Sequence, residues 1–273
     1  MVKFMLKNLH ILFLLIFSFC SCTISAQANS KIYYKVAEGK SAGIWPHNDR
    51  FLSIERMTEL KKKWGFDYLL LAAIYDEKDK RFVKEAGFDS LHIAYQIYLP
   101  DISAEKKYID KLARLGKVWA YFFDEPISRD HNYLDFLNLI IFLSENGLYP
   151  HAKFIVSELD EKKGKKVLPL VDVVTYSGYG NSNKFGSDQA ATWSEWKNYL
   201  GDKFGMPWIS AQSDSNEYRT LFKAAKDLDF NFVWFYALEP LPANQEINDS
   251  NYAKFCEAAV EFGFMVRIDQ SDR

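Results

Sequence analysis

The chain is 273 residues long, with 48% hydrophobic and 26% charged residues, which are ordinary values for a globular protein. Its length suits one large domain. The formal net charge of -2 gives no indication of a nucleic-acid or membrane-surface partner, so we expect neither.

The first segment of the chain has the pattern of an export signal. Lys3 and Lys7 precede an apolar run at 10–17 that is too short to span a bilayer, and Ala-Gln-Ala at 26–28 has the small residues of a cleavage site. The pattern predicts a secretory signal peptide over residues 1–28. We therefore expect the mature protein to work outside the cytoplasm, secreted or periplasmic, with no integral membrane span.

A lipoprotein signal is the alternative for the same segment, with Cys22 as the acylated residue. Phe19 and Cys20, which lie ahead of it, fit a lipoprotein signal poorly. Cleavage after Ala28 would remove both of these cysteines and leave Cys256 alone, so we expect no internal disulfide.

After the signal, one order of elements repeats: a strand, a polar loop, an amphipathic helix, a glycine and the next strand. The apolar runs predict eight strands, at 41–45, 66–75, 90–99, 117–125, 152–157, 171–176, 206–211 and 230–238. Helical spacing of apolar residues predicts helices at 53–64, 77–87, 103–115, 133–146, around 193–200, at 218–228 and at 252–262. The charge run at 162–166 is interpreted as a solvated loop or a short helix face.

Eight strands that alternate with helices indicate βαβ units and a parallel sheet, and their number favours a closed (β/α)8 barrel, an α/β fold. The alternative is a doubly wound open sheet, but no G-x-G-x-x-G or G-x-x-x-x-G-K-[ST] motif follows any predicted strand. No linker or repeat divides the chain. We therefore predict a single TIM barrel domain over residues 29–273.

The fourth predicted strand ends in two adjacent carboxylates, Asp124 and Glu125, followed by Pro126. Proline cannot continue a central strand, so the strand must end near Glu125. Both acids then lie at the carboxyl end of a strand, where α/β folds bind their ligands. A simpler interpretation is that the two acids only cap the following helix or face solvent.

Other residues that follow the predicted strands would gather around the same barrel mouth. They combine polar groups with aromatic rings, which suits a sugar, because the C–H-rich faces of sugars stack on rings. The predicted substrate-binding residues are Trp45, His47, Tyr95, Gln96, Tyr176, Gln212, Asp214, Trp234 and Tyr236. The chain has no H-E-x-x-H motif and no Cys/His cluster, so we predict no metal and no other cofactor.

The sequence Phe123-Asp124-Glu125-Pro126 resembles the end of the fourth strand in retaining (β/α)8 glycoside hydrolases, whose hallmark there is Asn-Glu-Pro. The resemblance implies that Glu125 is the general acid/base and that Asp124 stands where an asparagine contacts the sugar 2-hydroxyl. The chain departs from that family because it lacks the nucleophilic glutamate of strand seven, where only Asp214 is near. An Asp-Glu pair at this strand end is also similar to β-hexosaminidases, in which the Asp steadies the acetamido group of the substrate and the Glu protonates the leaving oxygen.

Glu239, at the end of strand eight, is the predicted second catalytic carboxylate. Strand eight lies opposite strand four in a closed ring, so Glu239 would face Glu125 across the mouth. Asp214 is the rival, although its position in the sequence 212–215 suits the start of a helix. A simpler interpretation also exists for Glu239, since a Glu-Pro pair can merely end a strand.

We therefore expect a secreted glycoside hydrolase that acts on a polysaccharide or oligosaccharide, with Glu125, Asp124 and Glu239 as its catalytic residues. One alternative is a non-catalytic carbohydrate-binding barrel that keeps an aromatic cleft. Another is a substrate-assisted N-acetylhexosaminidase that uses the Asp124–Glu125 pair. A second carboxyl group about 5–5.5 Å from Glu125 would imply retention of configuration, and one about 6.5–9.5 Å away would imply inversion.

Overall fold

The computed structural model of the chain describes residues 32–46, 52–71, 83–97, 118–127, 133–145, 152–176, 187–211, 213–237 and 245–269. The helices and strands given below lie in one compact unit, Tyr33–Ile268. The predicted signal peptide and Cys22 lie outside the described residues, so the signal and the domain boundary at residue 28 stay predictions.

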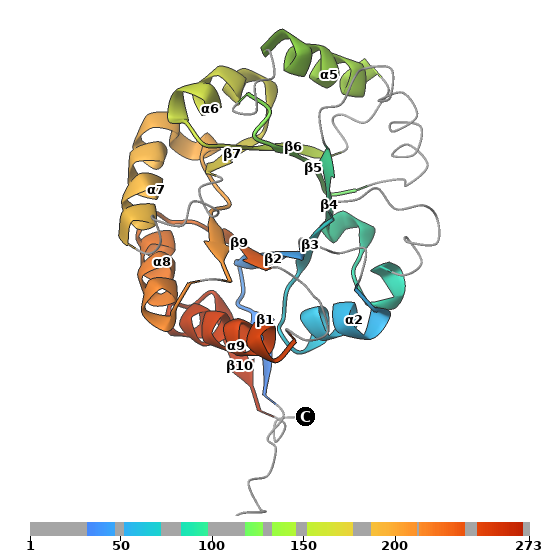
Figure 1. Ribbon diagram of the computed structural model, residues 1–273, viewed down its shortest axis with the longest axis vertical. Helices are drawn as coiled ribbons and strands as arrows, with labels where there is room; N and C mark the ends of the chain where they lie inside the picture. The colour runs from blue at the N-terminus through green and yellow to red at the C-terminus, as the bar shows by residue number, and fades with distance from the viewer. Residues whose placement is uncertain are drawn as a thin grey trace, which may run out of the picture. The chain divides into compact units, whose positions relative to one another are not determined.

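Eight parallel strands form the central sheet, and they form a ring in Figure 1. In chain order they are β2 (Ser41–Pro46), β3 (Tyr68–Leu71), β4 (Ile93–Ile97), β5 (Ala120–Asp124), β6 (Lys153–Glu158), β7 (Val173–Tyr176), β8 (Trp208–Ser210) and β9 (Phe232–Ala237). Their order in the sheet is β7-β6-β5-β4-β3-β2-β9-β8, so β2 pairs with both β3 and β9. Pairing of the first of these strands with the last one curls the sheet into a nearly closed ring, which confirms the predicted (β/α)8 barrel.

The ring is completed between β7 and β8 by a small set of contacts. Val174 and Phe204 form an isolated parallel bridge, and the Gly205 N–H donates to the Val174 carbonyl oxygen at 3.1 Å. The Thr175 hydroxyl donates to the Met206 carbonyl oxygen at 2.9 Å. We call this set of contacts the β7–β8 seam.

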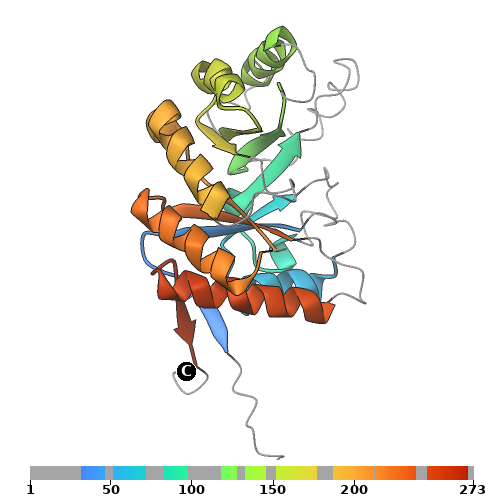
Figure 2. The same cartoon turned by 60° about the vertical axis from the view of Figure 1, so that its left-hand side comes forward.

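The α-helices of the described residues lie outside the ring of strands (Figure 1). They are α2 (Ile54–Lys62), α5 (Tyr133–Glu145), α6 (Glu161–Val167), α7 (Ser187–Leu200), α8 (Ser215–Asp227) and α9 (Gln245–Glu261). The helices α6 to α9 contact one another in chain order and form one continuous layer along the sheet (Figure 2). Side chains cap the starts of two of these helices: the Ser53 hydroxyl accepts the Arg56 N–H at α2, and Asp160 caps α6. The charge run at 162–166 is therefore part of a short helix.

Some predicted bounds differ from the observed ones. Residues 90–92 form the short 3-10 helix η2 (Ser90–His92) rather than the start of a strand. The helices α7 and α9 begin at Ser187 and Gln245, several residues earlier than the apolar spacing predicts. The helix predicted at 103–115 lies outside the described residues, and only 83–87 of the helix predicted before it is described.

A two-stranded antiparallel ribbon is present in addition to the eight predicted strands. In it β1 (Tyr33–Val36) pairs with β10 (Met265–Ile268). Tyr34 joins the ribbon to the helix layer, because its ring stacks on Trp64 with 6.1 Å between ring centroids and its hydroxyl donates to Glu257 of α9 at 2.6 Å. Burial and the Glu257 carboxylate both raise the pKa of the Tyr34 hydroxyl, so it stays a hydrogen-bond donor over the ordinary pH range.

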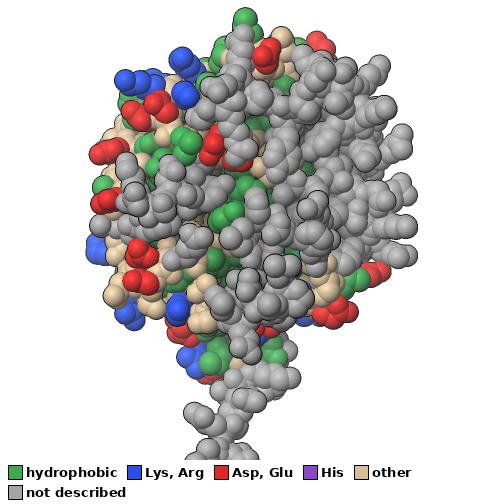
Figure 3. All heavy atoms as spheres, in the orientation of Figure 1, with side chains coloured by type: hydrophobic (Ala, Val, Ile, Leu, Met, Phe, Trp, Pro, Cys, Tyr) green, Lys and Arg blue, Asp and Glu red, His purple; other side chains and the backbone are tan. Residues whose placement is uncertain are grey.

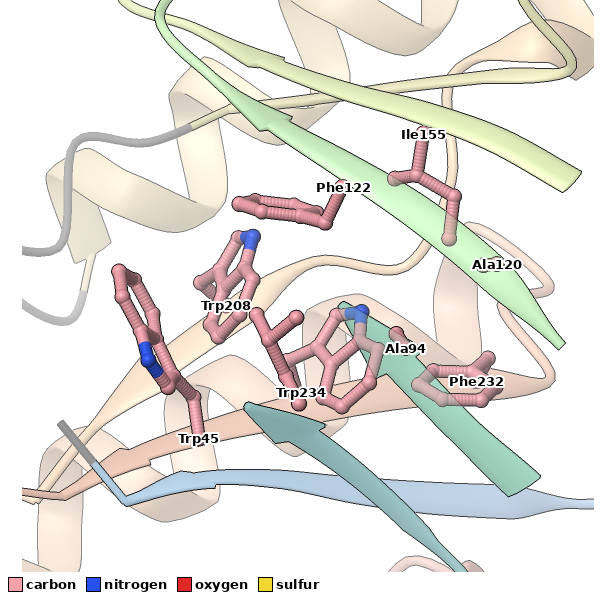
Figure 4. Packing of buried hydrophobic residues seen from close by; sticks show 9 residues of the cluster. Trp45, Ala94, Ala120, Phe122, Ile155, Trp208, Phe232 and Trp234 are labelled. Carbon is pink, nitrogen blue, oxygen red and sulfur yellow. The ribbon is translucent and has the colours of Figure 1, made fainter. Parts of the chain in front are cut away.

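Side chains, most of them aromatic, fill the inside of the barrel. Strand residues alternate between the inner and the outer face, and the inner face carries a core cluster of Trp45, Leu70, Ala94, Ala120, Phe122, Ile155, Trp208, Phe232 and Trp234 (Figure 4). Trp208 and Trp234 are stacked, with 5.2 Å between ring centroids and 14° between ring planes. Nearer the amino ends of the strands, Trp119 stacks on Phe232 at 5.3 Å. The interior is therefore a packed core rather than a pore.

The described part of the surface carries charges of both signs. Figure 3 shows basic and acidic side chains interspersed over it, in keeping with the net charge of -2. Among the helices of the described residues, none has the length and apolar composition that a bilayer span requires.

Gly43 leaves room for the core cluster, and its substitution by alanine is expected to destabilise the barrel. A Cβ atom at this position would overlap the six-membered ring of Trp234, which is fully buried between other rings and has no space to move. We expect Gly43→Ala to lower the free energy of unfolding by about 1–3 kcal/mol, measured by urea denaturation.

The matched control for this prediction is Gly205→Ala. A Cβ atom there would meet a Val173 methyl group at 3.8 Å, an ordinary contact distance. If the two variants are equally stable, close packing of Trp234 does not explain why glycine occupies position 43.

Candidate active site

The inner face of the barrel changes from apolar to polar toward the carboxyl ends of the strands. Two residues beyond an apolar inner position, each of five strands carries a polar residue on the same face. These residues, which we call the polar layer, are Gln96 (β4), Asp124 (β5), Ser157 (β6), Thr175 (β7) and Ser210 (β8). Because active sites of (β/α)8 barrels lie at this end of the strands, the polar layer is the floor of the candidate active site.

Asp124 is the acidic member of the polar layer and the last residue of β5. It is partly exposed, whereas Gln96, Ser157, Thr175 and Ser210 are buried. Its partner in the β5–β6 register is Ser157, whose hydroxyl donates to Asp124 Oδ1 at 3.1 Å. A donor to a carboxylate oxygen favours the ionised form, so this arrangement suits a negative charge at the mouth.

Glu125 directly follows and has a backbone conformation that few residues with a Cβ adopt. Its φ is +53°, in the left-handed region, and its N–H donates to the Ser157 carbonyl oxygen at 2.9 Å. Strict alternation would place Glu125 on the outer face next to the helices, but the positive φ breaks the strand geometry at this residue. The side chain is half-buried, so both members of the Asp-Glu pair are partly open to solvent.

The turn after Glu125 is held by a carboxylate of the neighbouring strand. Glu158, the last residue of β6, is fully buried, and its Oε1 accepts the Ile127 N–H at 2.7 Å. Glu158 lies on the outer face of the sheet, one residue after the inward-facing Ser157. It therefore supports the turn from behind and does not face the mouth.

Two of the predicted substrate-binding tyrosines lie on the outer face of the barrel. Tyr95 is next to the inward-facing Ala94 and Gln96, so its buried side chain points away from the interior. Tyr176 packs on Trp196 of α7, with 5.2 Å between ring centroids, and burial raises the pKa of its hydroxyl.

The predicted aromatic residues of β2 and β9 do face inward, but at different depths. Trp234 is fully buried in the middle of the core cluster, stacked on Trp208 (Figure 4). Trp45 and Tyr236 are register partners nearer the mouth, with rings edge to face at 5.1 Å between centroids. Trp45 is 2% exposed and Tyr236 is half-buried, so Tyr236 is the more accessible of these rings.

Asp214 caps α8, as its sequence context predicts. Its Oδ1 accepts the N–H groups of Asn216 and Glu217, and the Glu217 carboxylate accepts the Asp214 N–H at 2.7 Å in return. Its carboxylate accepts these bonds at the helix start, so its predicted role in the substrate site stays a prediction. His47, Gln212 and Glu239 lie outside the described residues, so their predicted roles, including that of Glu239 as second catalytic carboxylate, stay predictions.

The polar layer contains residues that the sequence analysis did not single out, namely Ser157, Thr175 and Ser210. A sequence signal existed, because each follows a large apolar inner residue by two positions. Among the described residues, no group of three or more His, Cys, Asp or Glu side chains is placed to hold a metal ion. The chemistry that the described part of the site offers is that of two adjacent carboxyl groups among hydroxyl and amide groups.

No family model matches the chain, and no curated protein matches it. Solved structures of similar fold do match. An active-site mutant of Rhizomucor miehei β-1,3-glucanosyltransferase in complex with laminaritriose gives a TM-score of 0.52 at 13% identity, covering 74% of this chain and 88% of that chain. A sugar phosphate isomerase/epimerase from Parabacteroides distasonis gives 0.51 at 12% identity, covering 81% and 98%. A flavocytochrome b2 mutant with pyruvate bound gives 0.50 at 11% identity, covering 85% and 69%. At these identities the likeness shows the TIM-barrel fold alone.

Trp234→Ala is expected to act on stability, because Trp234 is a core residue rather than a rim residue. Removal of this buried ring should lower the free energy of unfolding by about 3–5 kcal/mol, measured by urea denaturation. The control is Tyr199→Ala, an aromatic side chain on α7 that is 41% exposed and should change stability by about 0.5 kcal/mol or less. A Trp234→Ala variant as stable as the control would place Trp234 back on the rim.

Asp214→Ala should destabilise the protein through the lost helix cap, by about 0.5–2 kcal/mol in thermal or urea unfolding. Asp214→Asn is the matched variant, because asparagine caps helices about as well but carries no charge. We expect Asp214→Asn to keep the stability of the wild-type protein and its catalytic activity on any substrate that the wild-type protein turns over. Loss of activity in a stable Asp214→Asn variant would return this carboxylate to the active site.

Proposed function

We propose that this chain is a glycoside hydrolase in which Glu125 is the general acid and Asp124 is the carboxylate beside it. The observation that carries this proposal is the geometry at the end of β5. There, Asp124 faces the interior in the polar layer, and Glu125 follows it in a strained, hydrogen-bonded turn at the catalytic end of the barrel.

Cleavage of a glycosidic bond needs a proton on the leaving oxygen and stabilisation of the positive charge that develops on the sugar ring. Glu125, half-buried at the barrel end, is the proton donor in this proposal. Asp124, with a hydroxyl donor on Oδ1, supplies a negative charge next to it. The rim ring of Tyr236 is a stacking surface for a sugar face. The glucanosyltransferase among the structural neighbours, a barrel of similar fold, is in complex with laminaritriose, which is compatible with the proposal.

A substrate-assisted reaction on an N-acetylated sugar is the second candidate, and one observation favours it. Among the described acids at the carboxyl ends of the strands, Glu158 accepts the Ile127 N–H and Asp214 caps α8, whereas Asp124 and Glu125 are adjacent and partly exposed. A retaining mechanism with an enzymatic nucleophile needs a second carboxyl group about 5–5.5 Å from the acid. A substrate whose acetamido oxygen attacks the anomeric carbon needs no such group, and Asp124 would then orient the acetamido N–H.

The proposed site of action is outside the cytoplasm, on a polysaccharide or oligosaccharide. This part rests on the charged, apolar and small-residue segments of residues 1–28. A non-catalytic carbohydrate-binding barrel remains the competing function, and it differs in one measurable respect: it would bind a glycan without releasing any product.

Glu125→Gln should reduce turnover by about 10²- to 10⁴-fold while folding and glycan binding stay nearly unchanged, because only the transferable proton is lost. The measurement is product release from a panel of polysaccharides and from aryl glycosides. Aryl glycosides with a very acidic leaving phenol need little protonation, so the loss should be smaller on them. The control is Glu195→Gln, an exposed glutamate on α7. Wild-type rates in Glu125→Gln would remove Glu125 from the mechanism.

The same panel separates the two candidate mechanisms. Activity on aryl N-acetylhexosaminides but not on the matching hexosides, with severe loss in Asp124→Asn, supports substrate assistance. Activity on plain hexosides with a mild Asp124→Asn effect supports a separate nucleophile. Glycan binding with no product on any substrate would identify a binding protein instead.

A further inference from the structure

We propose that Ser157 and Glu158, the last two residues of β6, form a positioning pair that holds the Asp124–Glu125 turn in its working geometry. The inference rests on the proposed function of that turn and adds two residues to it. Neither residue of the pair is a proton donor or nucleophile in this proposal. Their role is to determine where the two carboxyl groups of β5 lie.

The pair makes three hydrogen bonds to three residues within the four-residue stretch 124–127. The Ser157 hydroxyl donates to Asp124 Oδ1 at 3.1 Å, and the Ser157 carbonyl oxygen accepts the Glu125 N–H at 2.9 Å. The Glu158 carboxylate accepts the Ile127 N–H at 2.7 Å. The side chain of Asp124 and the backbone on both sides of Pro126 are thus held by one dipeptide.

The turn needs such support because its backbone is strained. Glu125 has a φ of +53°, and a residue with a Cβ keeps such a conformation only where its surroundings determine it. Pro126 has no N–H group, so the N–H groups of Glu125 and Ile127 are the ones that can fix the turn. Both of them donate to β6. The strained residue is therefore bracketed by two bonds to the same neighbouring strand.

The side chain of Glu158 lies where it can hold the turn, and it does not face the mouth of the barrel. Its side chain is fully buried on the outer face, where an apolar residue would be less costly than a carboxylate. Val156, two residues earlier on the same face, is such an apolar residue. An acidic side chain at this position supplies an oxygen that accepts the Ile127 N–H, which an apolar residue cannot do.

The test compares two substitutions of Glu158 that have similar size. Glu158→Met removes the acceptor and keeps the length of the side chain, whereas Glu158→Gln keeps an oxygen that accepts the Ile127 N–H. The matched control is Asp172→Ala. Asp172 Oδ2 accepts the Phe154 N–H at 2.8 Å, so it makes the same kind of bond at the opposite end of β6.

The first readout is amide hydrogen exchange, which requires no substrate. In Glu158→Met the Glu125 and Ile127 amides should exchange at least about 10-fold faster, and Glu158→Gln should restore their protection. Asp172→Ala should accelerate exchange at Phe154 and leave residues 125–127 unchanged. Unchanged exchange at 125–127 in Glu158→Met overturns the positioning pair, whatever the protein catalyses.

The second readout is kinetic, on a glycoside that the wild-type protein cleaves. Misplacement of the acid should lower kcat in Glu158→Met by about 10- to 100-fold with KM within about 2-fold, and Glu158→Gln should recover most of it. Wild-type kcat together with faster exchange would show that the turn is held but that its geometry does not matter for the reaction, which also overturns the proposal. A wild-type protein that cleaves no glycoside refutes the proposed function, while the exchange result still decides whether Glu158 holds the turn.

Ser157→Ala tests the other half of the pair and serves if Glu158→Met does not fold. It removes the donor to Asp124 and keeps the carbonyl oxygen that accepts the Glu125 N–H. We expect kcat to fall by about 10-fold without faster exchange at residue 125. Wild-type kcat in Ser157→Ala would remove Ser157 from the pair.

Discussion

Side chains along a strand must alternate between two faces, and in a closed barrel one of those faces is the interior. The whole candidate site depends on this constraint. Asp124 reaches the polar layer because Phe122 fills the core two residues before it. The same alternation turns Tyr95 toward the helices and leaves Gln96 beside it facing inward. At the end of β6, the alternation places the side chain of Ser157 in the interior and that of Glu158 on the outer face. Two adjacent residues can therefore hold one turn from two sides.

The packed aromatic interior supports the polar layer of the candidate site from below. Trp208 and Trp234 lie stacked in the middle of the barrel, and the contact of Trp234 with Gly43 leaves no room for another side chain there. Because the core is filled to this height, the residues of the polar layer have a fixed depth. Groups placed on strands of a packed barrel are held more precisely than groups placed on loops. The cluster of tryptophans thus contributes to the geometry of the site without contacting a ligand.

The fold could be predicted from the sequence because its signals are local and repeated. Eight apolar runs separated by helical patterns suffice for a (β/α)8 barrel, and Asp124 and Glu125 could be placed at a strand end because Pro126 stops the strand. The orientation of individual rings could not be predicted in the same way. For Tyr176 and Trp234 it depends on which face of the strand is inward and how deep the core extends, and both follow from pairing with distant strands. The ribbon of β1 and β10 was not predicted, because its two strands are more than two hundred residues apart in the chain. The bond between Glu158 and Ile127 joins residues 31 positions apart, so no local sequence pattern indicates it either.

Among the described strands, the β7–β8 seam is the joint that has no ladder of paired residues. Elsewhere the described strands are joined by ladders, but within the described residues this joint has one isolated bridge, which includes the bond from the Gly205 N–H to the Val174 carbonyl oxygen, and the hydroxyl bond of Thr175. Parting of the strands at this joint would break fewer backbone hydrogen bonds than parting at a ladder, and it would leave the other strand pairs intact. Thr175 is a member of both the joint and the polar layer. Any widening of the β7–β8 seam would therefore change the width of the polar layer, the floor of the candidate active site, on the side next to Ser157.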